Sequence, residues 1–237
     1  MITRRTLLRR STLALSPPAC ALPWAALAQV APSATESQGY RGLHAAAQRG
    51  DVEEIERLAA NKALLETRDA HGRTPLHVAT FARQRGAVRA LLRAGADPGA
   101  LEDGRYDAVT IAAVADDETT LRVLLEEGAS ASLTTSRWDG TALIAAAHLG
   151  HAGVVRQLIA AGAPLDHVNN LHWTALMEAI VLGDGGARHQ ACVQALLQAG
   201  ANATLTDRDG RTPLQLAQAR GYDAMVRLLR EHTPGKL

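Results

Sequence analysis

Apolar residues recur along this chain in short helical blocks that are spaced by a nearly constant interval. Each block opens with a tetrapeptide of the Thr-Pro-Leu-His type. The clear copies begin at Thr74, Asp107, Thr141, Thr174 and Thr212, and a degenerate copy begins at Arg41. Thr74 and Asp107 are 33 residues apart, as are Thr141 and Thr174. A fixed period of this size predicts stacked supersecondary units and not one closed globule.

The unit from 138 to 170 shows the local signals most clearly. Thr141 is the expected N-cap of a helix over 142–149, because its side-chain oxygen can accept an otherwise unpaired backbone N–H. A Gly-His pair then predicts a break before a second helix over 154–161. Gly162 is expected to have a positive φ at the end of that helix. Two helices this short cannot bury their apolar faces alone, so neighbouring units must stack on them.

The tetrapeptide, the Gly-His pair and a closing Leu-Leu-x-x-Gly-Ala signature together resemble the ankyrin repeat pattern, over residues 40–232. The closing signature begins at Leu91, Leu124 and Leu196. The resemblance implies an all-α solenoid of about six helix-turn-helix units that are joined by β-hairpin-like loops. The expected units are 41–70, 71–103, 104–137, 138–170, 171–208 and 209–237, and the first and last are expected to be caps.

Residues 1–28 lie outside the repeat and predict an export signal. They hold four arginines and no acid, followed by an apolar stretch and an Ala26-Leu27-Ala28 cleavage pattern. The pair Arg4-Arg5 with Leu7, Leu8 and Arg9 resembles the twin-arginine signal of bacteria. We therefore expect cleavage after Ala28 and action in the periplasm, with no membrane attachment afterwards. An arginine-rich tail without export is the alternative. Residues 29–39 are expected to be a polar linker before a repeat domain over 40–237.

Composition narrows the function further. The net charge is +1, and removing residues 1–28 leaves 21 basic and 24 acidic side chains, a balance of −3. No basic stripe with interleaved aromatics is present, so nucleic acid is not an expected partner. After cleavage Cys192 is the only cysteine, and its apolar neighbours predict a buried, inert thiol.

The chain contains no recognised catalytic or cofactor motif. Nine histidines are present, but His148 and His151 have no carboxylate at helical ligand spacing, so no metal site is expected. The Asp116-Asp117-Glu118 run is expected to be a solvated bend that starts a helix, and not an acid–base pair. No cofactor is expected either. These observations favour non-catalytic binding of a protein partner.

The resemblance implies which residues would contact that partner. Side chains seven and eight residues after the tetrapeptide start would face a groove, and side chains before it would form the loop tips. The groove candidates are Phe81, Val114, His148, Leu149, Val181 and Leu182, and the tip candidates are Tyr106, Trp138 and Trp173. Either these residues form an exposed apolar partner site, or neighbouring turns bury them. Packing is favoured for Trp138 and exposure for Trp173.

The fifth unit departs from the period by five residues within 183–190. This glycine-rich stretch is expected to be a contact loop or a tolerated surface insertion. As a contact loop it would support a second hypothesis, that the protein regulates an exported enzyme. Glu178 also departs from the pattern, since the repeat usually has an apolar residue there. It is expected to pair with a neighbour or to protrude into the groove.

Overall fold

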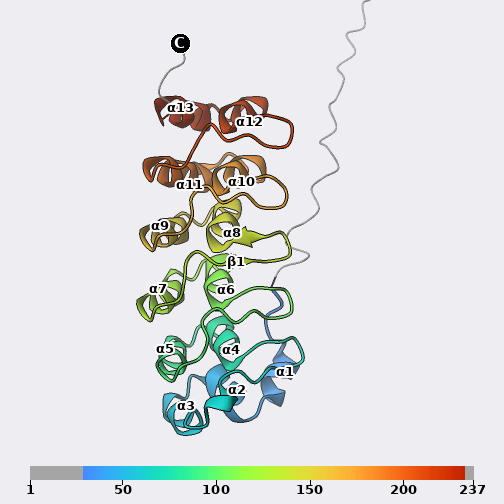
Figure 1. The fold of residues 1–237 in the computed structure, drawn as a ribbon, viewed down its shortest axis with the longest axis vertical. Helices are drawn as coiled ribbons and strands as arrows, with labels where there is room; N and C mark the ends of the chain where they lie inside the picture. Colours follow the sequence, from blue (N-terminus) through green and yellow to red (C-terminus); the bar gives the residue numbers. More distant parts are fainter. Residues whose placement is uncertain (1–28, 233–237) are drawn as a thin grey trace, which may run out of the picture.

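The computed structural model describes residues 29–232, which contain thirteen α-helices (Figure 1). Twelve of them, α2 to α13, build a stack of six helix pairs. The inner helices are α2 (Gly42–Arg49), α4 (Pro75–Phe81), α6 (Ala108–Val114), α8 (Ala142–Leu149), α10 (Ala175–Val181) and α12 (Pro213–Ala219). The outer helices are α3 (Val52–Leu58), α5 (Arg85–Arg93), α7 (Glu118–Glu126), α9 (Ala152–Ala160), α11 (Ala187–Gln198) and α13 (Asp223–His232). The all-α solenoid predicted from the repeat is confirmed. The predicted signal over 1–28 lies outside the described residues.

The inner helices begin where the sequence places their caps. The Thr141 side chain accepts the backbone N–H of Ile144 at 3.3 Å, and helix α8 follows over the predicted residues. Asp107 caps α6 in the same way by accepting from Thr110. In each case a short polar side chain satisfies a backbone donor that the first helical turn leaves free. The period of the sequence is therefore also the period of the helix starts.

A hairpin loop connects each outer helix to the next inner helix, and the hairpins project to one side of the stack (Figure 1). Strands β1 (Thr134–Thr135) and β2 (Gly140–Thr141) pair in antiparallel register within one of them. Neighbouring hairpins are joined by backbone hydrogen bonds, such as Asn170 N–H to the Trp138 carbonyl at 3.0 Å. These links hold the hairpin tips in a fixed order along the stack.

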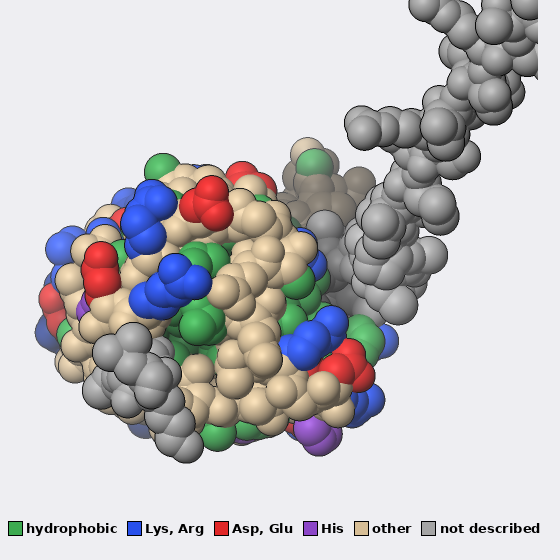
Figure 2. Space-filling model, turned by 90° about the horizontal axis from the view of Figure 1, so that it is seen from above, with side chains coloured by type: hydrophobic (Ala, Val, Ile, Leu, Met, Phe, Trp, Pro, Cys, Tyr) green, Lys and Arg blue, Asp and Glu red, His purple; other side chains and the backbone are tan. Residues whose placement is uncertain are grey.

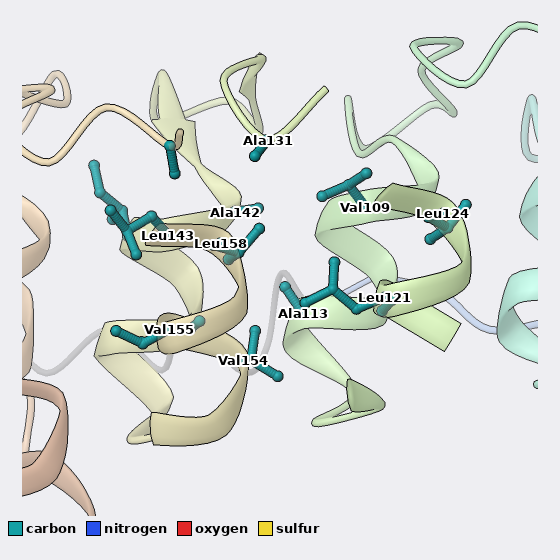
Figure 3. Packing of buried hydrophobic residues seen from close by; sticks show 14 of the residues in the cluster. Val109, Ala113, Leu121, Leu124, Ala131, Ala142, Leu143, Val154, Val155 and Leu158 are labelled. Carbon is teal, nitrogen blue, oxygen red and sulfur yellow. The ribbon is translucent and has the colours of Figure 1, made fainter. Parts of the chain in front are cut away.

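The core is a continuous layer of small aliphatic side chains between successive helix pairs. Figure 3 shows Ala113 of α6 beside Val154 of α9, at the boundary between the third and fourth units. Leu121, Leu143 and Leu158 are fully buried. Because each pair of short helices covers the apolar face of the next pair, most of the stability arises between units rather than within them.

Local predictions in the fourth unit are confirmed with one shift. Gly162 has φ of +81°, as expected. Helix α9 begins at Ala152, two residues before the predicted start, because Gly150 reverses the chain with φ of +72° and leaves no room for a longer break. Cys192 is fully buried, as predicted, and burial raises the pKa of its thiol to about 12.

The last unit ends the stack with a mixed surface. Arg227, Arg230 and Glu231 are exposed on α13, as expected for a cap. Figure 2 looks onto this end and shows apolar side chains at the centre, with charged side chains around them. Leu214 and Leu228 are half-buried here and pack against the core. The charged border gives the end of the stack the wetted face that repeat arrays need.

Residues 29–39 differ from the polar linker that the sequence predicts. They contain helix α1 (Ala34–Gly39), which begins with a capping box between Ser33 and Glu36. The preceding residue Pro32 and the side chain of Glu36 are partly buried. The segment is held against the stack by polar contacts and not by an apolar face, since no residue of α1 is buried.

His77 gives the stack a pH-dependent element that can be tested directly. Thr74 N–H donates to His77 Nδ1 at 3.1 Å, and His77 Nε2 lies 3.2 Å from the Tyr106 carbonyl, so the proton must be on Nε2. Burial lowers the pKa of His77 from 6.5 to about 4. Because the folded pKa is depressed, the stability it contributes is complete above pH 6.5 and is lost as the pH falls towards 4.

We expect His77→Gln to remove this pH dependence. In the last unit Gln215 occupies the same position and accepts the Thr212 N–H at 2.9 Å, so glutamine can keep the capping bond. Between pH 7 and pH 5 the wild type should lose about 2 kcal/mol more than the variant. Urea unfolding at the two pH values measures the difference. Parallel losses in both proteins would show that His77 is not the titrating group.

Candidate functional site

The apolar candidates lie at the C-terminal ends of adjacent inner helices. Phe81, Val114, Leu149 and Val181 are half-buried, and Leu182 is 38% exposed. We call these five residues the apolar row. Because α4, α6, α8 and α10 pack in sequence order, the row runs across four neighbouring units. Each side chain keeps part of its surface open while its helix is fixed by the core, which is the arrangement that rigid protein-binding surfaces use.

None of the three aromatic tip candidates is fully exposed. Tyr106 is only 5% exposed, so for this residue packing within the stack replaces the expected tip contact. Trp138 is half-buried, in line with the packing that we favoured for it. Trp173 is also half-buried and packs against the core, so the exposed position favoured for it is wrong.

Glu178 pairs with its neighbours and does not protrude. Its side chain is fully buried, with Oε2 at 3.0 Å from His148 Nδ1 and Oε1 at 2.9 Å from Asn169 Nδ2. The Asn169 side-chain oxygen accepts backbone N–H groups of Leu171 and Trp173, each at 3.0 Å. A buried carboxylate requires such partners, because an unpaired charge in the core would be strongly destabilising. Glu178 therefore joins the groove candidate His148 to the hairpin that carries Trp173.

The insertion of the fifth unit is anchored on both sides. It lengthens α11 to 12 residues, compared with 9 in α9. Tyr222 Oη donates to the Gly183 carbonyl at 3.0 Å, and His189 lies 2.9 Å from the His148 carbonyl and 2.8 Å from Asp184. These bonds make the segment a bridge between units, which favours the tolerated insertion over a free contact loop.

The acidic run of the third unit has a structural role. Asp117 is 4% exposed and caps α7 by accepting the Thr120 N–H at 3.1 Å and the Thr120 hydroxyl at 2.6 Å. The predicted helix start is confirmed, whereas the solvated position is wrong for Asp117, because its carboxylate turns inward to cap the helix. Arg85 lies 3.5 Å away, and these hydrogen bonds together with the nearby arginines lower the pKa of this carboxyl despite its burial.

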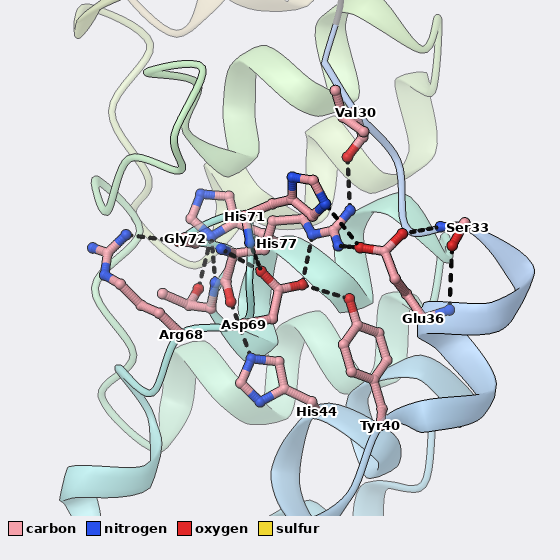
Figure 4. A network of polar contacts seen from close by, with 12 residues as sticks. Val30, Ser33, Glu36, Tyr40, His44, Arg68, Asp69, His71, Gly72 and His77 are labelled. Carbon is pink, nitrogen blue, oxygen red and sulfur yellow. Dashed lines mark hydrogen bonds and ion pairs between the residues drawn. The ribbon is translucent and has the colours of Figure 1, made fainter.

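A second polar cluster surrounds Arg73, to which the sequence analysis attached no role (Figure 4). The Arg73 side chain is fully buried; Nε donates to Asp69 at 2.6 Å and Nη1 donates to the Val30 carbonyl at 2.8 Å. Nη2 pairs with Glu36. Tyr40 Oη donates to Asp69 Oδ2 at 2.6 Å, and the same oxygen accepts the bond from Arg73 Nε. The cluster therefore fastens the segment before the first unit to the hairpin of the second.

The charges of this cluster support one another. Hydrogen bonds from Tyr40, from two backbone N–H groups and from Arg73 lower the pKa of Asp69 to about 2, against an opposing effect of burial. Hydrogen bonds within the capping box, with help from Arg73, lower the pKa of Glu36 to about 2. The two carboxylates and the guanidinium are thus all charged at neutral pH. One signal of this contact is visible in the sequence, the Ser-x-x-Glu capping box at Ser33.

Residues 29–232 contain neither a candidate metal site nor a candidate membrane-spanning helix. In this range no group of three or more His, Cys, Asp or Glu side chains could hold a metal ion. None of the helices in the same range combines the length and apolar content needed to cross a bilayer.

Comparison with known proteins places these features in a family context. A family model described as "Ankyrin repeats (3 copies)" matches residues 21–101 and 109–207. The putative ankyrin repeat protein YahD of Escherichia coli (strain K12) is 37% identical over 185 residues, which are 78% of this chain and 92% of that protein.

Solved structures agree with this likeness. An ankyrin repeat domain from Acinetobacter baumannii AYE superposes with a TM-score of 0.74 and 45% identity, covering 80% of this chain and 96% of that one. The ankyrin repeat domain of Bcl-3 has a TM-score of 0.73 and 30% identity, covering 83% of this chain and 88% of its own. The residues that the family model matches include the whole apolar row.

Proposed function

This chain belongs to the ankyrin repeat family, whose repeats are protein–protein interaction modules, and from that premise we propose that it is a non-catalytic binding protein whose apolar row docks a partner protein in the periplasm. The observation that carries the proposal is the apolar row itself. Five accessible apolar side chains lie on helix ends that the core holds in place. A surface of this kind binds without first having to be ordered, so little of the binding energy is lost to ordering it.

The structure also supports a rigid border to this surface. The Glu178 contacts fix His148 beside Leu149 and fix the hairpin around Trp173. A partner would meet an apolar strip with the His148 imidazole beside Leu149. Aromatic and apolar groups held in this way are the usual anchors of protein interfaces.

Affinity capture from periplasmic extract tests the proposal. We expect the chain over 29–237 to retain a partner that Phe81→Glu/Leu149→Glu loses, because two carboxylates would have to be desolvated in the interface. The retained amount should fall at least about tenfold, which corresponds to about 1.4 kcal/mol.

Leu133→Glu is the matched control. Leu133 is 36% exposed in a loop between units and lies outside the apolar row, so the same chemical change there should leave capture intact. Unfolding curves of all three proteins establish that they are equally folded. Equal retention by the apolar-row variant and the wild type would refute the assignment.

The periplasmic part of the proposal rests on the sequence of residues 1–28. We expect replacement of both Arg4 and Arg5 by lysine to stop export, because the resemblance to the twin-arginine signal depends on this pair. Cell fractionation with an antibody to the repeat domain measures the outcome. The variant should accumulate in the cytoplasm with its N-terminal segment uncleaved, and normal export would contradict the twin-arginine route.

A further inference from the structure

Residues 30–40 contact the stack in the manner of a bound peptide. Helix α1 has six residues and none of them is buried, so it has too few internal contacts to be stable alone. Its position depends on the second-unit hairpin (residues 69–73), which lies directly before helix α4. Figure 4 shows the segment beside this hairpin, with side-chain and main-chain groups both engaged.

The contacts are of three chemical kinds. Glu36 gives a carboxylate to the Arg73 guanidinium and lies 3.1 Å from His71 Nε2. The main-chain carbonyl of Val30 accepts from Arg73 Nη1 at 2.8 Å, and the phenol of Tyr40 donates to Asp69 at 2.6 Å. The hairpin therefore recognises an acidic residue, a carbonyl and a hydroxyl donor within eleven residues of peptide.

The last unit shows why the second-unit hairpin needs an outside carboxylate. The sixth-unit hairpin (residues 207–211) has the same fold, with Asp207 and Arg211 in the places of Asp69 and Arg73. Arg211 Nη2 lies 2.8 Å from both Asp207 and Asp209, and the arginine side chain stays 50% exposed. The residue equivalent to Asp209 in the second unit is His71, so this hairpin lacks one carboxylate. Glu36 provides it from another part of the chain.

We propose that residues 30–40 are an internal peptide ligand of the second-unit hairpin, and that the surface they cover accepts an acidic helical peptide of a partner protein when they leave. The proposal rests on the proposed function, since it assigns a second contact surface to the same binding protein. A tethered segment has an effective concentration on the order of millimolar, so a partner peptide must compete with it. When the internal segment is weakened, the hairpin is free in a larger fraction of the molecules. The apparent affinity of the protein for a partner peptide rises with that fraction.

A peptide titration tests this in the full chain. The probe is a fluorescein-labelled peptide with the sequence of residues 29–41, and fluorescence anisotropy measures its binding. The variant Glu36→Gln/Tyr40→Phe weakens the internal segment without altering the hairpin. We expect it to bind the probe at least about tenfold more tightly than the wild type does. A probe with glutamine in place of Glu36 should not bind.

Two further variants establish where the probe binds. Adding Arg73→Ala to the double variant should abolish binding, whereas adding Arg211→Ala should leave it unchanged. Equal probe binding by wild type and double variant, or binding that survives Arg73→Ala, would overturn the proposal. The titration involves no natural partner, so its failure is distinct from failure of the capture experiment.

Hydrogen exchange on the wild type gives a test that needs no variant. The amides of residues 37 and 40 donate to the carbonyls of Ser33 and Glu36 and should be protected at least about tenfold relative to a free peptide. Glu36→Gln/Tyr40→Phe should lose that protection while α4 and α6 keep theirs. Exchange at free-peptide rates in the wild type would show that the segment is not a bound ligand.

Discussion

Replacing Arg73 with alanine is expected to lower the free energy of unfolding by about 3 kcal/mol. The side chain is fully buried, and its loss leaves Asp69 without its cation in a nearly buried position. The expected value is at the lower end of the range for a broken buried pair, because Glu36 keeps contact with water and can be hydrated. Urea unfolding at pH 7 measures the change.

Arg211→Ala is the matched control, because it removes the same residue type from the same hairpin position. Arg211 is half-exposed and its carboxylate partners can be solvated, so its loss should cost less than about 1 kcal/mol. Equal costs for the two substitutions would mean that the N-terminal segment contributes nothing to the second unit.

The difference between wild type and Arg73→Ala should also depend on pH in a defined direction. The pKa of Asp69 is lowered from 3.8, and that of Glu36 from 4.5, to about 2 in the folded chain. Because these folded values are depressed, the stability they contribute is complete above about pH 4.5 and is lost as the pH falls towards 2. Most of this window lies below the one expected for His77, so the two effects can be separated by measurements above pH 4.5 and below pH 4.

Glu178→Ala is the second large effect, with an expected loss of about 3 kcal/mol. The substitution removes a fully buried carboxylate together with its contacts to His148 and to the Asn169 amide. It also leaves a cavity beside the apolar row. Glu178→Gln keeps the shape and one acceptor oxygen, so it should lose clearly less. Thermal and urea unfolding of both variants give the comparison.

Glu126→Ala is a suitable control for the loss of a glutamate. Glu126 is 52% exposed and pairs with Arg89 at 3.0 Å on an outer helix, where solvent replaces the contact. A change below about 0.5 kcal/mol is expected there. If Glu178→Ala behaved in the same way, the carboxylate would not be part of the core that fixes His148.

The parts of the fold that follow the period could be predicted from the sequence. Thr141 begins its helix as expected, and Gly162 has the expected backbone, because caps and turns depend on neighbouring residues. The stacking of units followed from the shortness of the helices. The resemblance to the ankyrin repeat implied the positions of the apolar row, but counting residues along the chain could not establish that its side chains are half-buried.

The features that could not be predicted depend on contacts between residues that lie far apart in the sequence. Val30 and Arg73 are 43 positions apart, and nothing in the period relates them. Whether Glu178 was buried or exposed depended on a partner in another unit, His148, 30 positions before it. The insertion was visible as extra residues, but its anchoring by Tyr222 required the geometry of the following unit. In each case the two partners lie at least 30 positions apart in the sequence.

The attachment of residue 30 to Arg73 has a mechanical consequence. The first unit lies between these two positions in the sequence, so it forms a closed loop whose ends are fastened at one hairpin. A force applied to the N-terminus would act on the hairpin of the second unit before it acted on α2. The guanidinium contacts would bear the load in parallel, and the first unit would be peeled away only after they had broken.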